Sequence, residues 1–167
     1  MFCEYKDKLE TVREKIASAE RAYREGNITE EEYCALKRRL LSYVLPCDDY
    51  YSEPDFRYVI IKIRESTILE KGSLYEAVRR AWRINVDRIS GYRYVFAVVD
   101  GVVRGIFIAR QWKKVTSGPD AGRYEFFGDN APYELEHKFI RKRIPPYYSK
   151  FGMASPVLYC PSRESRV

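Results

Sequence analysis

Apolar side chains recur at alternating intervals of four and three residues near the start of the chain. This stripe consists of Tyr5, Leu9, Val12, Ile16, Ala19 and Tyr23. Because the spacing places all six on one face of a helix, we predict a helix from Glu4 to Glu25. Gly26 supplies the left-handed residue that ends it. A stripe this narrow is typical of a helix that packs on a neighbouring helix.

A second helix is predicted directly downstream. Thr29 and Glu32 have the spacing of a capping box, and the acidic first turn suits the helix dipole. The helix is expected to continue through Leu36, Leu40 and Val44 and to end before Pro46. Since the loop between the helices is short, the two should pair antiparallel over residues 1–46.

The predicted helical hairpin resembles a known short motif. The matching residues are Gly26-Asn27-Ile28-Thr29-Glu30-Glu31-Glu32-Tyr33, followed by Leu36-Lys37 and Leu40-Leu41. Together they are similar to the SHOCT-type helical motif over about 35 residues. The resemblance implies a small oligomerisation or docking element, whereas the simpler alternative is a hairpin that only covers the main domain.

Downstream of the predicted hairpin, the pattern of apolar residues changes to one that is typical of β-strands. Residues 47–56 hold four acidic residues and no basic residue, which predicts an acidic linker. Runs of β-branched and aromatic residues predict strands at 57–64, 92–99, 102–108, 123–127 and 156–160. Asp100-Gly101 predicts a hairpin, and Gly105 predicts a bulge or a close-approach point. A helix is expected to begin at Ser73, which would form a capping box with Glu76, and to carry Tyr75, Arg79 and Trp82 on one stripe at i, i+4 and i+7. Further helices are expected at 86–89 and 131–139.

This order of elements predicts an α+β domain over residues 57–167 with a small, curved or barrel-like sheet. Several stretches are similar to uncharacterised bacterial PUA-like domains: Gly72-Ser73-Leu74-Tyr75-Glu76-Ala77-Val78-Arg79-Arg80-Ala81-Trp82, Tyr94-Val95-Phe96-Ala97-Val98 with Asp100-Gly101, Trp112, Arg123-Tyr124-Glu125-Phe126 and Ser155-Pro156-Val157-Leu158-Tyr159. The resemblance spans about 100 residues. It implies a mixed or antiparallel β-barrel with flanking helices. It also implies a pocket between barrel and helix, which relatives in the PUA, ASCH, EVE and YTH groups use for a nucleobase, often modified, or for RNA. The aromatic cage of the YTH and EVE groups has no residue-by-residue counterpart here.

Charge is distributed unevenly along the chain. Residues 1–46 hold nine basic and nine acidic residues, whereas residues 57–167 hold 21 basic and 11 acidic residues. Such an excess favours attraction to a phosphate backbone, against the alternative of a solvated basic surface without a partner.

Two sets of side chains suit a nucleic-acid partner. Rings can stack on an unpaired or flipped base, and guanidinium groups can fork to phosphates or base edges. The expected base-binding or ligand-binding residues are Tyr75, Arg79, Trp82, Trp112, Arg123 and Tyr124. The expected phosphate-binding residues are Lys113, Lys114, Lys138, Arg141, Lys142 and Arg143.

Each set also has a structural interpretation. Both tryptophans could belong to the core or seal its rim, Arg79 could form an internal ion pair, and Arg123 and Tyr124 could be an exposed strand pair. The run from Lys138 to Lys150 is interleaved with aromatic residues, as in a single-stranded backbone track, but could equally be a solvated loop.

Several classes of protein lack support in the sequence. The four cysteines form no CxxC pair and His137 is the only histidine, so no metal site and no cofactor are expected. There is no Walker loop, GxGxxG or HExxH motif. No run of eighteen apolar residues and no apolar signal core occurs, which favours a cytoplasmic protein without membrane contact.

Three hypotheses stay open. The first is a module that binds RNA or DNA, single-stranded or with a flipped base. The second is an enzyme similar to the ASCH group, a metal-independent ribonuclease or nucleoside-derivative hydrolase that would use Tyr75, Arg79, Arg123 and Glu125. The third is an adaptor whose hairpin, residues 1–46, forms a homodimer or docks on a partner protein.

Overall fold

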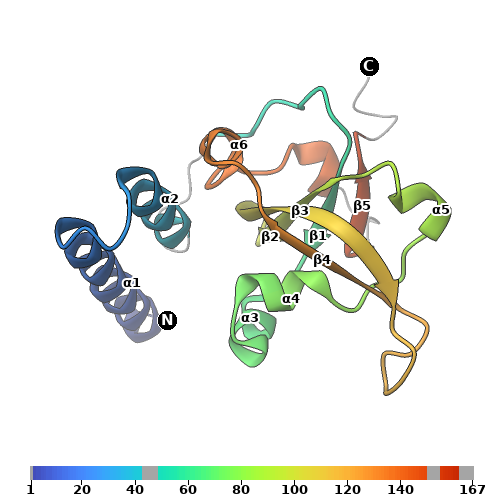
Figure 1. The fold of residues 1–167 in the computed structure, drawn as a ribbon, viewed down its shortest axis with the longest axis horizontal. Helices are drawn as coiled ribbons and strands as arrows, with labels where there is room; N and C mark the ends of the chain where they lie inside the picture. Colours follow the sequence, from blue (N-terminus) through green and yellow to red (C-terminus); the bar gives the residue numbers. More distant parts are fainter. Residues whose placement is uncertain (1, 43–48, 150–154, 162–167) are drawn as a thin grey trace.

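The fold is built around one mixed sheet (Figure 1). The computed structural model describes residues 2–42, 49–149 and 155–161. The sheet has the order β4-β3-β2-β1-β5, with the strands β1 (Tyr58–Lys62), β2 (Tyr94–Val99), β3 (Val102–Lys114), β4 (Tyr124–Asn130) and β5 (Val157–Cys160). Strands β1 and β2 are parallel, and the other neighbouring pairs are antiparallel.

The sheet is open, which corrects the expectation of a closed barrel. A barrel requires the two outermost strands to pair with each other. Here β4 and β5 stand at opposite ends of the strand order, and no pairing joins them in the described residues. The α+β class is confirmed, whereas a barrel of the PUA-like kind is not.

Helices cover both faces of the sheet (Figure 1). The connection from β1 to β2 contains α3 (Glu65–Lys71), α4 (Leu74–Arg79) and α5 (Val86–Ile89), which supply core residues to one face. The other face is covered by α6 (Tyr133–Phe139) and the 3₁₀ turn η1 (Pro146–Ser149). Residues 58–61 and 95–99 are at most 1 % exposed, so the inner strands are buried on both sides, which explains why they are apolar without alternation.

Gly105 behaves as predicted, both as a bulge and as a close-approach point. The register between β2 and β3 shifts beside it, which leaves Arg104 as an extra residue on β3. A Cβ atom on Gly105 would lie 2.7 Å from Cδ2 of Leu74. The missing side chain therefore lets α4 approach the sheet closely.

The helical hairpin consists of α1 (Phe2–Arg24) and α2 (Glu30–Leu41), and Gly26, which was predicted to end the first helix, has a φ of +76°. The second helix was predicted to continue through Val44, but α2 ends at Leu41 with Ser42 as its C-cap, and Val44 and Pro46 lie outside the described residues. Glu32 N donates to Thr29 Oγ1 at 3.1 Å, and Thr29 N donates to Glu32 Oε2 at 2.7 Å, which confirms the capping box. No helix in the described part of the chain has the length and apolarity needed to cross a bilayer.

Ion pairs attach the hairpin to the sheet domain. Arg39 of α2 donates to Glu136 of α6 twice, with Nε–Oε2 at 3.0 Å and Nη2–Oε1 at 2.5 Å. The Glu136 side chain is only 1 % exposed. Lys8 of α1 donates to Glu65 of α3 at 2.5 Å. Because a buried carboxylate needs a partner, the hairpin contributes to the charge balance of the domain interior.

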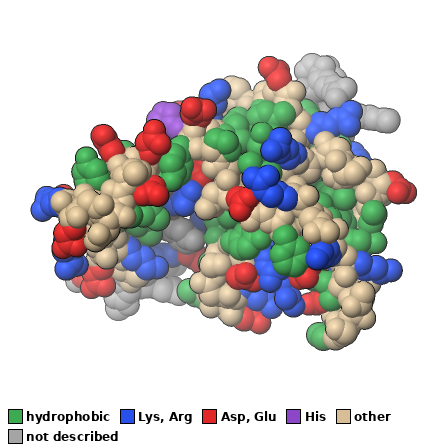
Figure 2. Space-filling view, viewed as in Figure 1, with side chains coloured by type: hydrophobic (Ala, Val, Ile, Leu, Met, Phe, Trp, Pro, Cys, Tyr) green, Lys and Arg blue, Asp and Glu red, His purple; other side chains and the backbone are tan. Residues whose placement is uncertain are grey.

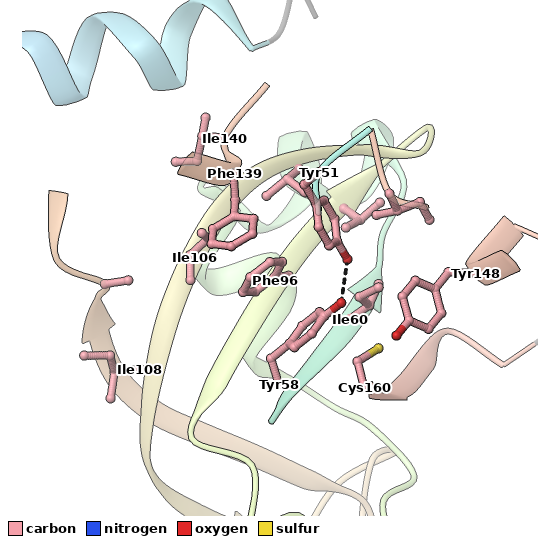
Figure 3. Close-up of a cluster of buried hydrophobic side chains, with 14 residues drawn as sticks. Tyr51, Tyr58, Ile60, Phe96, Ile106, Ile108, Phe139, Ile140, Tyr148 and Cys160 are labelled. Carbon is pink, nitrogen blue, oxygen red and sulfur yellow. Dashed lines mark hydrogen bonds between the residues drawn. The ribbon is translucent and has the colours of Figure 1, made fainter. Parts of the chain in front are cut away.

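The segment predicted as a linker is packed into the domain. Tyr51 is 3 % exposed and belongs to the core on the α6 side of the sheet (Figure 3). Its N–H donates to Arg143 O at 3.0 Å, and Arg143 N–H donates to Asp49 O at 2.9 Å. The ring of Phe56 lies 4.7 Å from that of Tyr94. Residues 49–56 therefore form part of the folded body, because their aromatic rings bury a large apolar area.

We predict that the Arg39–Glu136 pair is needed for stability. Arg39→Met would strand the Glu136 carboxylate in the interior and lower the free energy of unfolding by about 3 kcal/mol. The double variant Arg39→Met/Glu136→Met replaces both charges by apolar groups and should lose less than about 1 kcal/mol. Urea denaturation at pH 7 measures both values, and equal losses in the single and double variants would contradict the assigned role.

Candidate functional site

Most of the predicted ligand-binding residues gather between α4 and the β3–β4 pair. The rings of Tyr75 and Trp112 lie 5.9 Å and 5.1 Å from the ring of Phe126, which is fully buried. Tyr124 begins β4 and exchanges two backbone hydrogen bonds of 2.9 Å with Trp82. Tyr75 and Trp112 therefore flank the same core ring, Phe126.

Trp82 does not continue the helix that carries Tyr75 and Arg79. The helix α4 ends at Arg79 because Arg80 is extended, with φ −154° and ψ 153°, and Trp82 pairs with Tyr124 of β4. The indole Nε1 of Trp82 donates to Val78 O at 2.6 Å. The expected helical stripe of Tyr75, Arg79 and Trp82 is therefore wrong at its third member.

Arg79 forms the internal ion pair that was the structural alternative. Its side chain is 14 % exposed, its Nε donates to Glu76 Oε2 at 2.8 Å, and its Nη1 lies 3.5 Å from Glu125 Oε2. The guanidinium also stands over the rings of Tyr75 and Phe127. Arg79 and Glu125, two residues of the enzyme hypothesis, therefore neutralise each other in this structure.

The predicted phosphate-binding residues do not form one track. Figure 2 shows Lys and Arg side chains scattered among acidic and apolar ones on this face. Arg123 is exposed and lies 3.9 Å from Asp120. Of the remaining basic residues, two lie at the far end of β3 and four lie on or just after α6: Lys113 and Lys114, then Lys138, Arg141, Lys142 and Arg143.

The aromatic residues of the basic run belong mainly to the core. Phe139 and Tyr148 are 6 % and 1 % exposed, and Tyr147 packs against the same core. Lys150 and Phe151 lie outside the described residues. The interleaved pattern arises because α6 and the segment after it cover the sheet, so the described rings Phe139, Tyr147 and Tyr148 contribute to its core.

A bulge decides where Trp112 points. The register between β3 and β4 shifts between Ala109 and Gln111, which leaves Arg110 as an extra residue on β3. Because side chains alternate along a strand, an extra residue reverses the faces beyond it. Trp112, rather than Gln111, therefore lies against the core layer that contains Phe107.

Trp112 lines a hollow of about 580 Å³ at the end of the sheet near α5. The other walls are mostly apolar and come from α5, from the start of β2 and from β3, and include Val86, Ile89, Tyr92, Arg93, Ile108 and Ala109. Within the described residues, the Nε1 atom of Trp112 is buried without a hydrogen-bond partner. An apolar hollow with an aromatic wall and a few polar groups is typical of a small-ligand site.

A second hollow of about 430 Å³ adjoins the first and is more polar. Its walls include Arg57, Asp87, Arg88, Gly91 and Pro161, while Ser90 and Tyr92 line both hollows. The two hollows therefore lie on different faces of the short helix α5, which stands at the end of the molecule opposite the hairpin (Figure 1).

Positive charge without acidic partners gathers at this end. We define the α5 rim as Arg57, Arg88, Arg93, Tyr92 and Tyr159. None of its three arginines forms an ion pair with a described residue, in contrast to Arg79, Arg104 and Arg110. The sequence-based prediction missed the α5 rim, because its members come from three segments distant along the chain.

A second polar cluster lies within the core on the α6 side. Tyr58, Tyr147 and Tyr148 all donate their hydroxyl groups to the Glu53 carboxylate, with Tyr147 at 2.5 Å and Tyr148 at 2.8 Å. Tyr51 and Tyr58 hydroxyls are 2.9 Å apart, as Figure 3 shows. This cluster joins residues 49–56 to β1 and η1, and its satisfied hydrogen bonds indicate a structural role.

Burial sets the ionisation of this cluster. It raises the pKa of the Tyr51, Tyr58 and Tyr147 hydroxyls above the ordinary tyrosine value, and it raises the pKa of the Cys160 thiol to about 12. These groups are therefore neutral in the folded protein at neutral pH. Among the described residues, no group of three or more His, Cys, Asp or Glu side chains could hold a metal ion.

No protein-family model, curated protein sequence or solved structure matches this chain. A functional assignment therefore depends on the geometry of the two hollows and the α5 rim.

We predict that stability falls as the pH rises above about 9. In the unfolded chain Cys160 ionises near its ordinary pKa of 9.0, whereas in the folded state it keeps its proton up to about 12. Since the unfolded state then binds fewer protons, the free energy of unfolding decreases with pH in this window. Cys160→Ala should make the slope between pH 9 and 11 shallower by about 1 kcal/mol per pH unit.

The exposed Cys34 offers a matched control for that measurement. Denaturant titrations at several pH values should give Cys34→Ala the slope of the parent protein. A parent slope that Cys160→Ala leaves unchanged would mean that the buried thiol does not contribute to the alkaline loss of stability.

Proposed function

We propose that this protein binds single-stranded RNA or DNA, or a base flipped out of a duplex, at the end of the sheet that carries α5. The observation that carries the proposal is the hollow beside Trp112, which combines two aromatic walls with a rim of arginines that form no ion pair with a described residue. The protein would act as a binding module.

The chemistry of the hollow suits a nucleobase. Tyr92 and Trp112 offer ring surfaces, and base–aromatic stacking contributes about 1–3 kcal/mol per base. The side chains of Ile108 and Ala109 would contact the apolar ring of a base, and polar groups such as Gln111 would hydrogen-bond to its edges. A hollow of about 580 Å³ falls within the size range of small-ligand pockets.

The charge of the domain supports the same partner. Residues 57–167 carry ten more basic than acidic residues. Three of these basic residues, the arginines of the α5 rim, lie beside the hollow. A guanidinium that forms no ion pair is available to bind a phosphate.

We predict salt-dependent binding of a short single-stranded oligonucleotide. The logarithm of the association constant should fall linearly with the logarithm of the salt concentration, because phosphate contacts release counterions. Fluorescence anisotropy with labelled RNA and DNA strands of mixed sequence, plain and base-modified, measures this dependence. Absence of binding to every strand at low salt would refute the proposed function.

The two tryptophans should differ in a direct test of the hollow. Trp112→Ala removes a wall of the hollow and should weaken binding about 10-fold to 100-fold, as the loss of one stacked base predicts. Trp82 packs in the same core layer but does not line the hollow, so Trp82→Ala should lower the melting temperature without that loss of affinity. An equal loss of affinity in both folded variants would move the base-binding site away from the hollow.

A further inference from the structure

We infer that the hollow between Arg57 and Arg88 is a phosphate-binding subsite, which holds the phosphate of a nucleotide whose base occupies the neighbouring hollow beside Trp112. This inference rests on the proposed function and adds a defined anion site to it. The shared chemistry is a phosphate group, which either an internal phosphodiester or the phosphorylated end of a strand would supply.

Two touching tyrosine rings orient the arginines. The rings of Tyr92 and Tyr159 pack edge to face, with centroids 5.2 Å apart. The guanidinium of Arg57 stands over Tyr92 at 6.0 Å, and that of Arg88 stands over Tyr159 at 4.3 Å. Because stacking on a ring restricts a long side chain, both guanidinium groups are positioned before a ligand arrives, which lowers the entropy cost of binding.

Gly91 allows Arg57 to come close to the backbone of the hollow. A Cβ atom at this position would lie 3.2 Å from Nη1 of Arg57. An alanine side chain would therefore press on the tip of the guanidinium without meeting other side chains or a rigid part of the sheet. The glycine leaves room at the point where the guanidinium and the backbone border the same hollow.

The balance of charge around the hollow favours a phosphate. Its walls carry two guanidinium groups, the Ser90 hydroxyl and one carboxylate, Asp87. No ion pair within 4.0 Å joins Asp87 to either arginine in the described residues. A guanidinium binds phosphate oxygens through two parallel N–H groups, so two of them can satisfy one phosphate group.

The position of this hollow fits one nucleotide across α5. Ser90 and Tyr92 line both hollows, so a base beside Trp112 and a phosphate beside Arg57 would be neighbours. The more polar hollow, beside Arg57, would bind the phosphate, and the more apolar hollow, beside Trp112, would bind the base. Each hollow has the chemistry that one half of a nucleotide requires.

The test compares Arg57→Gln and Arg88→Gln with Arg83→Gln in the full chain. Arg83 is an exposed arginine close by in the sequence and lines neither hollow. Each of the first two changes should lower the affinity for a short oligonucleotide about tenfold and reduce the salt slope by about one, whereas Arg83→Gln should leave both nearly unchanged. Equal effects of all three would mean diffuse attraction and would overturn the subsite.

Smaller probes separate the subsite from the proposed function. Calorimetric titration with a nucleoside 5′-monophosphate, its nucleoside and inorganic phosphate should show that Arg57→Gln and Arg88→Gln weaken the two phosphate-containing probes but not the nucleoside. Gly91→Ala should weaken the same two probes by a smaller factor with an unchanged melting temperature. If phosphate binds but no oligonucleotide does, the proposed function fails and the subsite stands. If oligonucleotides bind and neither arginine change affects them, the subsite fails and the function stands.

A terminal and an internal phosphate are distinguished with matched strands. Strands with and without a 5′-phosphate or a 3′-phosphate should differ in affinity only if the hollow holds a strand end, and Arg57→Gln should abolish that difference. Equal affinities that both arginine changes lower would assign the hollow to an internal phosphodiester. Equal affinities that neither change lowers would overturn the subsite.

Discussion

The parallel pairing of β1 and β2, both buried on two faces, is the constraint on which the rest of the molecule depends. Parallel neighbours start at the same edge of a sheet, and Tyr58 stands opposite Tyr94 in their register. The residues just before them, Arg57 and Arg93, are therefore brought to one edge although 36 positions separate them. The connection between the strands must return along the whole sheet, and it brings α5 with Arg88 to that same edge. The α5 rim is thus a consequence of topology.

Local signals in the sequence predicted the helical hairpin, its capping box and most of the strands, because capping and alternation act over a few residues. The helix α3 and the six residues by which β3 exceeds its predicted length were missed. Beyond Ile108 the strand carries the polar residues Arg110, Gln111, Lys113 and Lys114. These residues give no strand signal in the sequence, although this part of β3 pairs with β4. The packed state of residues 49–56 was missed for a similar reason. Their acidic composition suggested a linker, but Tyr51 and Phe56 bury their rings and Glu53 accepts tyrosine hydroxyl groups.

The candidate site was harder to predict, because free and paired charges look alike in a sequence. Arg79 was chosen for its place beside aromatic residues, yet Glu76, three positions before it, and Glu125, 46 positions after it, neutralise it. Arg57 and Arg88 were not chosen, although neither forms an ion pair with a described residue. One signal was present: two apolar strands without alternation indicate a parallel, doubly covered pair. That pattern would have placed Arg57 beside Arg93. Arg88 and Tyr159 required the structure, since neither lies in a periodic pattern that points to the same edge.

The structure also places the helical hairpin and the α5 rim far apart, a separation that the sequence did not show. The hairpin is joined to α6 by a buried carboxylate at one end of the molecule, and the α5 rim lies at the other end (Figure 1). A change at Arg39 would act on ligand binding only through the stability of the whole domain, since the two sites share no side chain. A change at Arg57 or Arg88 removes charge from an exposed rim and leaves the core untouched. Any coupling between hairpin and rim would therefore have to pass through β1–β3, whose close packing resists small displacements. For this reason, if the hairpin docks on a partner as the third hypothesis holds, that docking and the proposed binding at the rim should be independent, with effects on free energy that add.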